Sequence, residues 1–324
     1  MTQSQVSTPP ASSSPPPEAA RRGRRRIRRF STRDKVLMAV MLGIPLLADV
    51  LFIWVPAIST VGLSFTTWDN LGGSSSIKNN GLGNYKFAAQ VDPQFWPAIW
   101  HNVLWLLVFV CIATPLGMLF AIIIDRNIRG SRIYQSVLFL PVMLSLALIG
   151  IIWELIYSQN FGLLNSVLGR TGDTNAIDWL GNPHLNLWAV LVEASWRQAG
   201  YVMVLYLAGL KAVDPTLREA ASLDGANAWT TFWKVIFPVM RPINVVILVI
   251  TVIESLRAYD LVYITSKGAV LPGLELLSML VTEWIMGQTQ RIGYGSALAT
   301  VLLLVSLVPI CIFLWNNFRK EDAR

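Results

Sequence analysis

One polar loop, residues 211–242, holds the side chains most suited to specific contact with another protein. Asp214-Pro215 is a typical helix start, because an Asp side chain accepts hydrogen bonds from free amides and Pro fits the first turn. Gly225 is a natural helix stop, which predicts a helix of about 15 Å between them. An Ala pair gives this helix a shallow surface, and charged side chains at its edge add polar contacts. The residues concerned are Arg218, Glu219, Ala220, Ala221, Asp224 and Gly225.

A second short helix is expected directly after the first, over about residues 227–236. It presents an apolar face suited to packing against the protein's own helices. The aromatic residues of this face are Trp229, Phe232 and Trp233. Pro238 and Pro242 are expected to end the helix, because Pro removes a backbone donor and clashes with the preceding turn.

The composition indicates a membrane protein, since 54% of the residues are hydrophobic and only 14% are charged. A bilayer core of about 30 Å needs roughly 20 mostly apolar helical residues, so six spans are predicted. They cover about residues 36–60, 99–124, 133–157, 185–210, 243–264 and 296–318. The fold class is therefore an all-α six-helix membrane bundle over residues 36–318, between an amino-terminal tail, 1–35, and a carboxyl-terminal tail, 319–324.

The 26 Lys and Arg residues are concentrated on one side of these spans. They lie mainly in the first tail, after the second and fourth spans, and at the carboxyl end, so both termini and loop 211–242 are expected to be cytoplasmic. Residues 1–20, rich in Ser and Pro, are expected to be disordered. The basic run from Arg21 to Arg33 supplies most of the net charge of +7 and predicts contact with anionic membrane lipid rather than nucleic acid.

Motifs for catalysis or cofactor binding are absent from the sequence. It contains no GxxxxGK[ST] phosphate loop for ATP, and its two histidines, His101 and His184, do not form a catalytic or metal-ligating pattern. Cys111 and Cys311 fall within predicted spans and are expected to pack as apolar residues. The chain is therefore predicted to be a non-enzyme without a bound metal or cofactor.

The polar loop carries a longer pattern. Glu219-Ala220-Ala221 is followed after three residues by Gly225 and after nine more by Val235-Ile236-Phe237-Pro238. This resembles the signature of permease subunits of binding-protein-dependent ABC importers, where Glu-Ala-Ala, Gly and Ile-x-Leu-Pro have the same spacing. The resemblance covers roughly residues 36–318 and is closest to carbohydrate permeases of the maltose, trehalose and glycerol-phosphate type. Further blocks in the family's order are Gly83-Asn84-Tyr85, Phe161-Gly162-Leu163-Leu164-Asn165, Trp179-Leu180-Gly181 and Asp260-Leu261-Val262-Tyr263.

The resemblance implies a type I importer in the cell membrane, in which this chain is one non-catalytic transport subunit. The expected partners are a second, paralogous permease, two ATP-binding subunits that hold ATP and Mg, and an extracytoplasmic solute-binding protein or lipoprotein. Loop 211–242 would contain the coupling helix that sits in one ATPase. The expected cargo is a sugar.

Several ionisable residues lie inside predicted spans, where a charge usually faces protein or water. Arg197 and Glu254 are both near mid-membrane, so they are expected to pair between helices. Two interpretations are open: a pocket whose polar groups bind sugar hydroxyls while Trp196 stacks on a ring, or a structural ion-pair network with Trp196 in ordinary packing. The pathway candidates are Glu193, Trp196, Arg197, Gln198, Glu254, Arg257, Tyr259, Asp260 and Asp49.

Two alternatives to a sugar permease remain. The same importer architecture could carry a non-sugar solute, such as glycerol-phosphate or a polyamine, and ligand binding by the solute-binding protein would decide this. The chain could instead be a stand-alone ion-coupled carrier that uses Asp49, Glu193 and Glu254 as proton sites. That hypothesis predicts gradient-driven flux without a motor protein and leaves the Glu219 pattern unexplained.

Overall fold

The computed structural model describes residues 31–69, 73–126, 128–172, 175–288 and 290–321. Residues 1–30, which include the predicted disordered segment, lie outside this part of the chain. Within the described residues every regular element is helical, apart from an isolated β-bridge between Thr66 and Asn79. The all-α prediction is therefore confirmed. The chain divides into two compact units, one ending at Trp54 and one beginning at Val55.

The first unit consists of α1 (Thr32–Asp49) and the π-helical η1 (Val50–Trp54). Ser31 and Asp34 form a reciprocal capping box at the start of α1. None of the residues of α1 or η1 is buried, although most are apolar, as expected for a helix surrounded by lipid.

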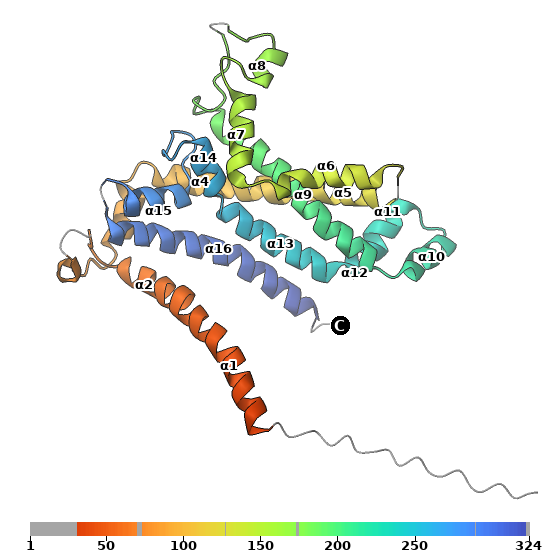
Figure 1. The fold of residues 1–324 in the computed structure, drawn as a ribbon, viewed down its shortest axis with the longest axis horizontal. Helices are drawn as coiled ribbons and strands as arrows, with labels where there is room; N and C mark the ends of the chain where they lie inside the picture. Colours follow the sequence, from red (N-terminus) through yellow and green to blue (C-terminus); the bar gives the residue numbers. More distant parts are fainter. Residues whose placement is uncertain (1–30, 70–72, 127, 173–174, 289, 322–324) are drawn as a thin grey trace, which may run out of the picture. The chain divides into compact units, whose positions relative to one another are not determined.

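The centre of the second unit is the packing of α5 (Thr114–Asp125) along α9 (Asn186–Ala212) (Figure 1). Gly117 makes this close approach possible, because a Cβ atom there would lie 2.6 Å from the carbonyl oxygen of Ala199. Gly200 does the same on another face of α9, where a Cβ atom would lie 2.3 Å from the carbonyl oxygen of Leu138 in α6 (Ser131–Met143). Small residues thus let three apolar helices meet at backbone distance.

Five of the six predicted spans agree with helices that are apolar and long enough to cross a bilayer, counting each bent helix pair as one span. The fourth predicted span, about residues 185–210, is α9, which is not among them. This 27-residue helix is instead the most extensively buried element and lies among other helices. Its polar side chains therefore face protein, which explains how it can be the least apolar of the six.

The third predicted span is divided by a sharp bend. α6 and α7 (Leu146–Tyr157) meet at an angle of 102°. Leu144 is extended, and the Ser145 hydroxyl accepts a hydrogen bond from the Leu148 amide and starts a new helix. Figure 1 shows α7 and α8 (Leu163–Val167) projecting away from the line of α6.

The remaining helices complete the second unit. α4 (Phe95–Val108) continues through η3 (Phe109–Ala113) into α5, and α13 (Arg241–Leu256) packs against both α4 and α9. The other elements are α2 (Val55–Leu63), η2 (Gly73–Ser76), α3 (Gly83–Gln90), α10 (Pro215–Leu223), α11 (Ala228–Thr231), η4 (Phe232–Ile236), α12 (Phe237–Val239), α14 (Asp260–Thr265), α15 (Leu277–Met286) and α16 (Ile292–Glu321).

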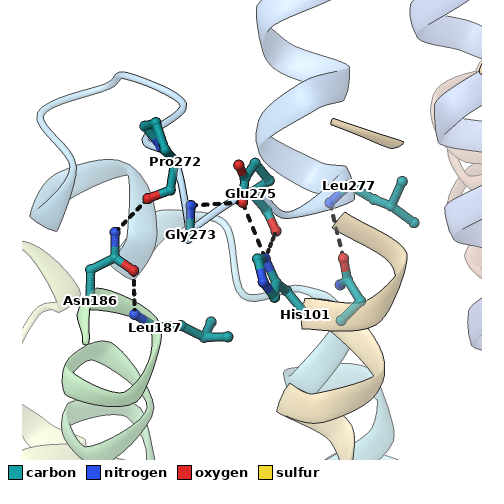
Figure 2. Close-up of polar contacts among 8 residues, drawn as sticks. His101, Asn186, Leu187, Pro272, Gly273, Glu275 and Leu277 are labelled. Carbon is teal, nitrogen blue, oxygen red and sulfur yellow. Dashed lines mark hydrogen bonds and ion pairs between the residues drawn. The ribbon is translucent and has the colours of Figure 1, made fainter. Parts of the chain in front are cut away.

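The loop between α14 and α15 is fixed to the ends of α4 and α9 by polar contacts (Figure 2). Asn186 Nδ2 donates to the carbonyl oxygen of Pro272 at 2.9 Å. His101 Nδ1 lies 2.9 Å from the carbonyl oxygen of Glu275 and 3.4 Å from its Oε2. Gly273 has a φ of +84°, and a Cβ atom there would clash with the backbone of Pro183. The loop therefore holds one end of the bundle in a defined arrangement.

Candidate functional site

The first short helix of loop 211–242 begins and ends as predicted. Pro215 is its first residue, and Asp214 Oδ1 accepts a hydrogen bond from the Thr216 amide at 2.9 Å. This backbone hydrogen bond holds the pKa of Asp214 below its usual range, because it stabilises the carboxylate form. Gly225 has a φ of +76°, the left-handed conformation that terminates a helix. Local capping rules are sufficient to define α10.

The side chains predicted to form the outer surface of α10 are not all exposed. Glu219, Ala220 and Asp224 are exposed, whereas Ala221 is buried against the bundle. Adjacent residues on a helix point in directions about 100° apart, so Ala220 and Ala221 cannot form one outer surface. The expected open Ala pair is wrong, and the exposed face of α10 is made by Glu219, Ala220 and the last turn with Leu223.

Arg218, predicted at the edge of this surface, is 38% exposed and is partly turned to the bundle. Its Nη1 lies 2.8 Å from Asp125 Oδ2 at the end of α5, and its Nη2 donates to the carbonyl oxygen of Leu210 in α9 at 3.3 Å. The Asp125 side chain is only 12% exposed. Arg218 therefore fastens α10 to two helices of the bundle. Sequence reasoning missed Asp125, which is recognisable only as an acidic residue at the end of the second span.

A groove of about 730 Å³ lies beside this ion pair, between α10 and the end of α5. Its wall combines the charged pair with apolar side chains from the second short helix. The lining includes Ile122, Asp125, Arg218, Ser222, Phe232 and Ile236. At this end of the molecule α10 and α11 lie beside the end of α5 and the start of α6 (Figure 1).

The second short helix is longer than predicted and partly differs in orientation. α11, η4 and α12 form one helical segment, residues 228–239, which begins at Asn227 and passes through Pro238 without ending there. Phe232 is buried as expected. Trp229 and Trp233 instead are 72% and 37% exposed, so the prediction that they pack on the bundle was wrong. Their rings lie 5.6 Å apart on one side of the segment.

The predicted pair inside the bundle is confirmed. Arg197 Nη1 lies 3.4 Å from Glu254 Oε2, and the two side chains are 27% and 33% exposed. They border a small cavity between α4, α9, α13 and α14. Arg257 and Asp260 line the same cavity, so four predicted pathway residues come together. Trp105 and Phe109 supply the apolar part of its wall.

Two other predicted pathway residues of α9 lie away from this cavity. Glu193 is fully buried, and neither of its carboxylate oxygens has a hydrogen-bond partner among the described residues. Gln198 is also buried, with its Nε2 3.4 Å from the Thr251 hydroxyl. Among the described residues Glu193 does not pair with Arg197, which turns to Glu254.

The aromatic candidates have other neighbours. Trp196 makes an edge-to-face contact with Trp153, with ring centroids 5.8 Å apart. It lines a separate apolar groove of about 910 Å³, together with Val192 and Leu138. The structure therefore does not bring Trp196 to the Arg197 cavity. Tyr259 packs beside Tyr263, with ring centroids 5.2 Å apart.

Asp49 belongs to the first compact unit and is described only within it. Its Oδ2 accepts a hydrogen bond from the indole Nε1 of Trp54 at 3.1 Å. This contact gives the carboxylate a side-chain partner within the first unit.

Comparison with known proteins agrees with this geometry. The chain is 31% identical to the xylose/arabinose import permease of Haloferax volcanii over 304 residues, covering 91% of this chain and 92% of that protein. It is 30% identical to the alpha-glucoside transport system permease of Rhizobium meliloti, covering 91% and 86%. A solved bacterial ABC transporter involved in alginate import has the same fold, with a TM-score of 0.73 at 20% identity, covering 89% and 96%. The model of the binding-protein-dependent transport system inner membrane component matches residues 113–321, and the chain belongs to this family of ABC transporter permeases.

Proposed function

We propose that the chain forms half of the translocation pathway for a sugar in an ATP-driven importer, and that a separate ATPase drives it through α10. The partners would be a paralogous second permease, two ATP-binding subunits and an extracytoplasmic solute-binding protein. Support for the cargo comes from relatives named for xylose/arabinose, alpha-glucoside and arabinooligosaccharide transport. Both termini and α10 would be cytoplasmic, as the distribution of Lys and Arg indicates.

The observation that carries this proposal is the position of α10. Its outer face, with Glu219 and Asp224, is exposed, while Arg218 on its inner face is ion-paired to Asp125 at 2.8 Å. A force applied to the outer face therefore reaches α5 directly. α5 packs along α9, which carries Arg197, so a rigid movement of α10 would be transmitted toward the cavity.

The cavity beside Arg197 and Glu254 suits a small polar solute. Four charged side chains line it, Arg197, Glu254, Arg257 and Asp260, and a few convergent polar groups are typical of small-molecule sites. The two charged side chains are partly exposed and can exchange their long mutual contact for hydrogen bonds to hydroxyl groups. Trp105 and Phe109 provide the apolar surface that covers a sugar ring.

The coupling proposal is tested by a charge reversal, Glu219→Lys, in the assembled importer. We expect solute uptake to fall by at least about ten-fold, equivalent to roughly 1.4 kcal/mol of coupling free energy, while the permease remains in the membrane. Lys86→Glu, an exposed charge reversal on α3, is the control and should retain uptake. Wild-type uptake by Glu219→Lys would refute the role of α10.

The cargo is tested separately with the purified solute-binding protein. A sugar should bind to it and stimulate ATP hydrolysis by the complete importer. Binding of glycerol-phosphate or a polyamine in place of a sugar would refute the sugar assignment but not the coupling role. The stand-alone carrier receives no support from the geometry, because Glu193 does not line the cavity that contains Glu254.

A further inference from the structure

The helical segment 228–239 has an orientation that the coupling role does not require. It meets the spanning segment Arg241–Thr265 at an angle of 78°. A helix at this angle to a spanning helix lies nearly parallel to the membrane plane. Because it directly precedes the start of that span, it lies at the depth of the membrane surface.

Aromatic side chains form a ladder along the outer face of this segment. The rings of Trp229 and Trp233 are 5.6 Å apart, and those of Trp233 and Phe237 are 5.0 Å apart. Trp229 is 72% exposed and Trp233 is 37% exposed. The adjacent face, with Phe232 and Ile236, is buried in the bundle. The ladder is thus an apolar surface that the chain itself leaves uncovered.

Three observations favour lipid rather than protein as the occupant of this surface. Val239 at the end of the segment and Val246 and Ile253 on α13, which follows it, are also apolar and exposed. An indole ring has an apolar body and an N–H donor, which is why Trp is enriched at membrane interfaces. Lys234 is exposed beside the ladder and complements anionic headgroups.

We infer that residues 228–239 are an interfacial helix, with Trp229 and Trp233 inserted into the headgroup region of the membrane. The inference rests on the family's membrane location and is independent of the ATPase contact proposed for α10. The segment then anchors in lipid the part of loop 211–242 that directly precedes α13. The polar outer face of α10 remains free for a protein partner.

The test measures how accessible a nitroxide spin label at position 229 or 233 is to oxygen and to a water-soluble reagent. The protein is placed in liposomes of neutral and anionic phospholipid. Cys111→Ala and Cys311→Ala first remove the native cysteines. A single cysteine for the spin label is then introduced by Trp229→Cys or Trp233→Cys. Asp224→Cys on α10 is the matched control. We expect collisions with oxygen to exceed those with a water-soluble nickel chelate at 229 and 233, and the reverse at 224. Each protein is measured alone and with its ATP-binding subunits.

Two results would overturn the inference. One is a water-like profile at 229 and 233, the same as at 224. The other is a loss of access to both reagents only when the ATP-binding subunits are added, which would make the ladder a protein contact. Neither result depends on transport, so a failure here is distinguishable from a failure of the proposed coupling.

The unmodified protein provides a second measurement. A phospholipid with a photoreactive diazirine near its glycerol backbone is activated in the same liposomes. Trypsin cleavage after Arg218 and Lys234 releases residues 219–234, which contain both Trp residues. We expect lipid adducts on Trp229 or Trp233. Absence of adducts in this peptide, while α13 is labelled, would contradict the inference.

Discussion

Two ion pairs of the second unit use the same chemistry but differ in geometry. Arg218 and Asp125 lie 2.8 Å apart, and a carbonyl oxygen of Leu210 accepts a further hydrogen bond from the guanidinium. Arg197 and Glu254 lie 3.4 Å apart beside a cavity, with both side chains about one-third exposed. A short pair with its donors satisfied fastens two elements together. A long pair with solvent access retains hydrogen-bonding capacity for a ligand.

The largest expected effect comes from breaking the short pair. Asp125→Ala removes the anchor of α10 and leaves the Arg218 guanidinium without its carboxylate. Because loss of one partner of a buried pair costs about 3–5 kcal/mol, and Arg218 is 38% exposed, we expect a smaller loss that still lowers uptake at least about ten-fold. Uptake into vesicles and the amount of permease in the membrane are measured together.

The exchanged pair, Asp125→Arg with Arg218→Asp, is the control for the short ion pair. It should recover much of the uptake, because the two side chains can meet again in the opposite order. Uptake close to wild type in Asp125→Ala would mean that α10 does not act through this contact.

Breaking the long pair, Arg197 with Glu254, should change the affinity for the solute rather than the assembly of the importer. Arg197→Gln keeps a hydrogen-bond donor but removes the charge. Since a hydrogen bond to a charged group contributes about 1.5–3 kcal/mol, we expect the KM of uptake to rise by about ten-fold or more. Arg291→Gln is the matched control, because Arg291 lies over Phe87, outside the Arg197 cavity. Unchanged uptake and unchanged solute-stimulated ATPase activity in Arg197→Gln would place the pair in a purely structural role.

Trp196 provides a test of position, because Arg197 lines the cavity whereas Trp196, the residue before it, does not. Trp196→Leu should change the KM by no more than about two-fold, as expected for a substitution of about 0.5 kcal/mol or less outside a binding site. A rise comparable to that of Arg197→Gln would show that the ring does reach the solute. The same uptake assay measures both variants.

The smallest effect is expected at a third pair, Lys267 with Glu154, 2.7 Å apart at the end of α14. The Glu154 carboxylate accepts a hydrogen bond from Lys267 and raises the pKa of this exposed ammonium group. A raised Lys pKa stabilises the folded state below the ordinary Lys pKa, and this contribution is lost only as the pH rises through the folded pKa. Lys267→Gln should therefore lower the Tm at most slightly below the folded Lys pKa and not at all above it, because exposed pairs contribute little. A clear drop in Tm near neutral pH would contradict this.

Local rules were enough for some elements. Asp214, Pro215 and Gly225 defined α10 correctly, because caps and helix stops depend on neighbouring residues alone. Depth along the spans was enough to pair Arg197 with Glu254. The break at Ser145 was missed, because one capping hydroxyl is a weak signal within a long apolar run. The exposure of Trp229 was missed, because the face of a short helix that meets the bundle depends on helices that are distant in the sequence.

The sequence by itself determined that this chain is a helical membrane protein, that one polar loop contains a capped helix, and that charges lie deep in its bundle. These properties follow from composition, spacing and periodicity, which are read along the chain. Only the tertiary structure decided that Arg218 turns inward to Asp125 and that Arg197, but not Glu193, borders the cavity. The reason is that the direction of a helical side chain has meaning only relative to the helices packed around it, and those neighbours are distant in the sequence.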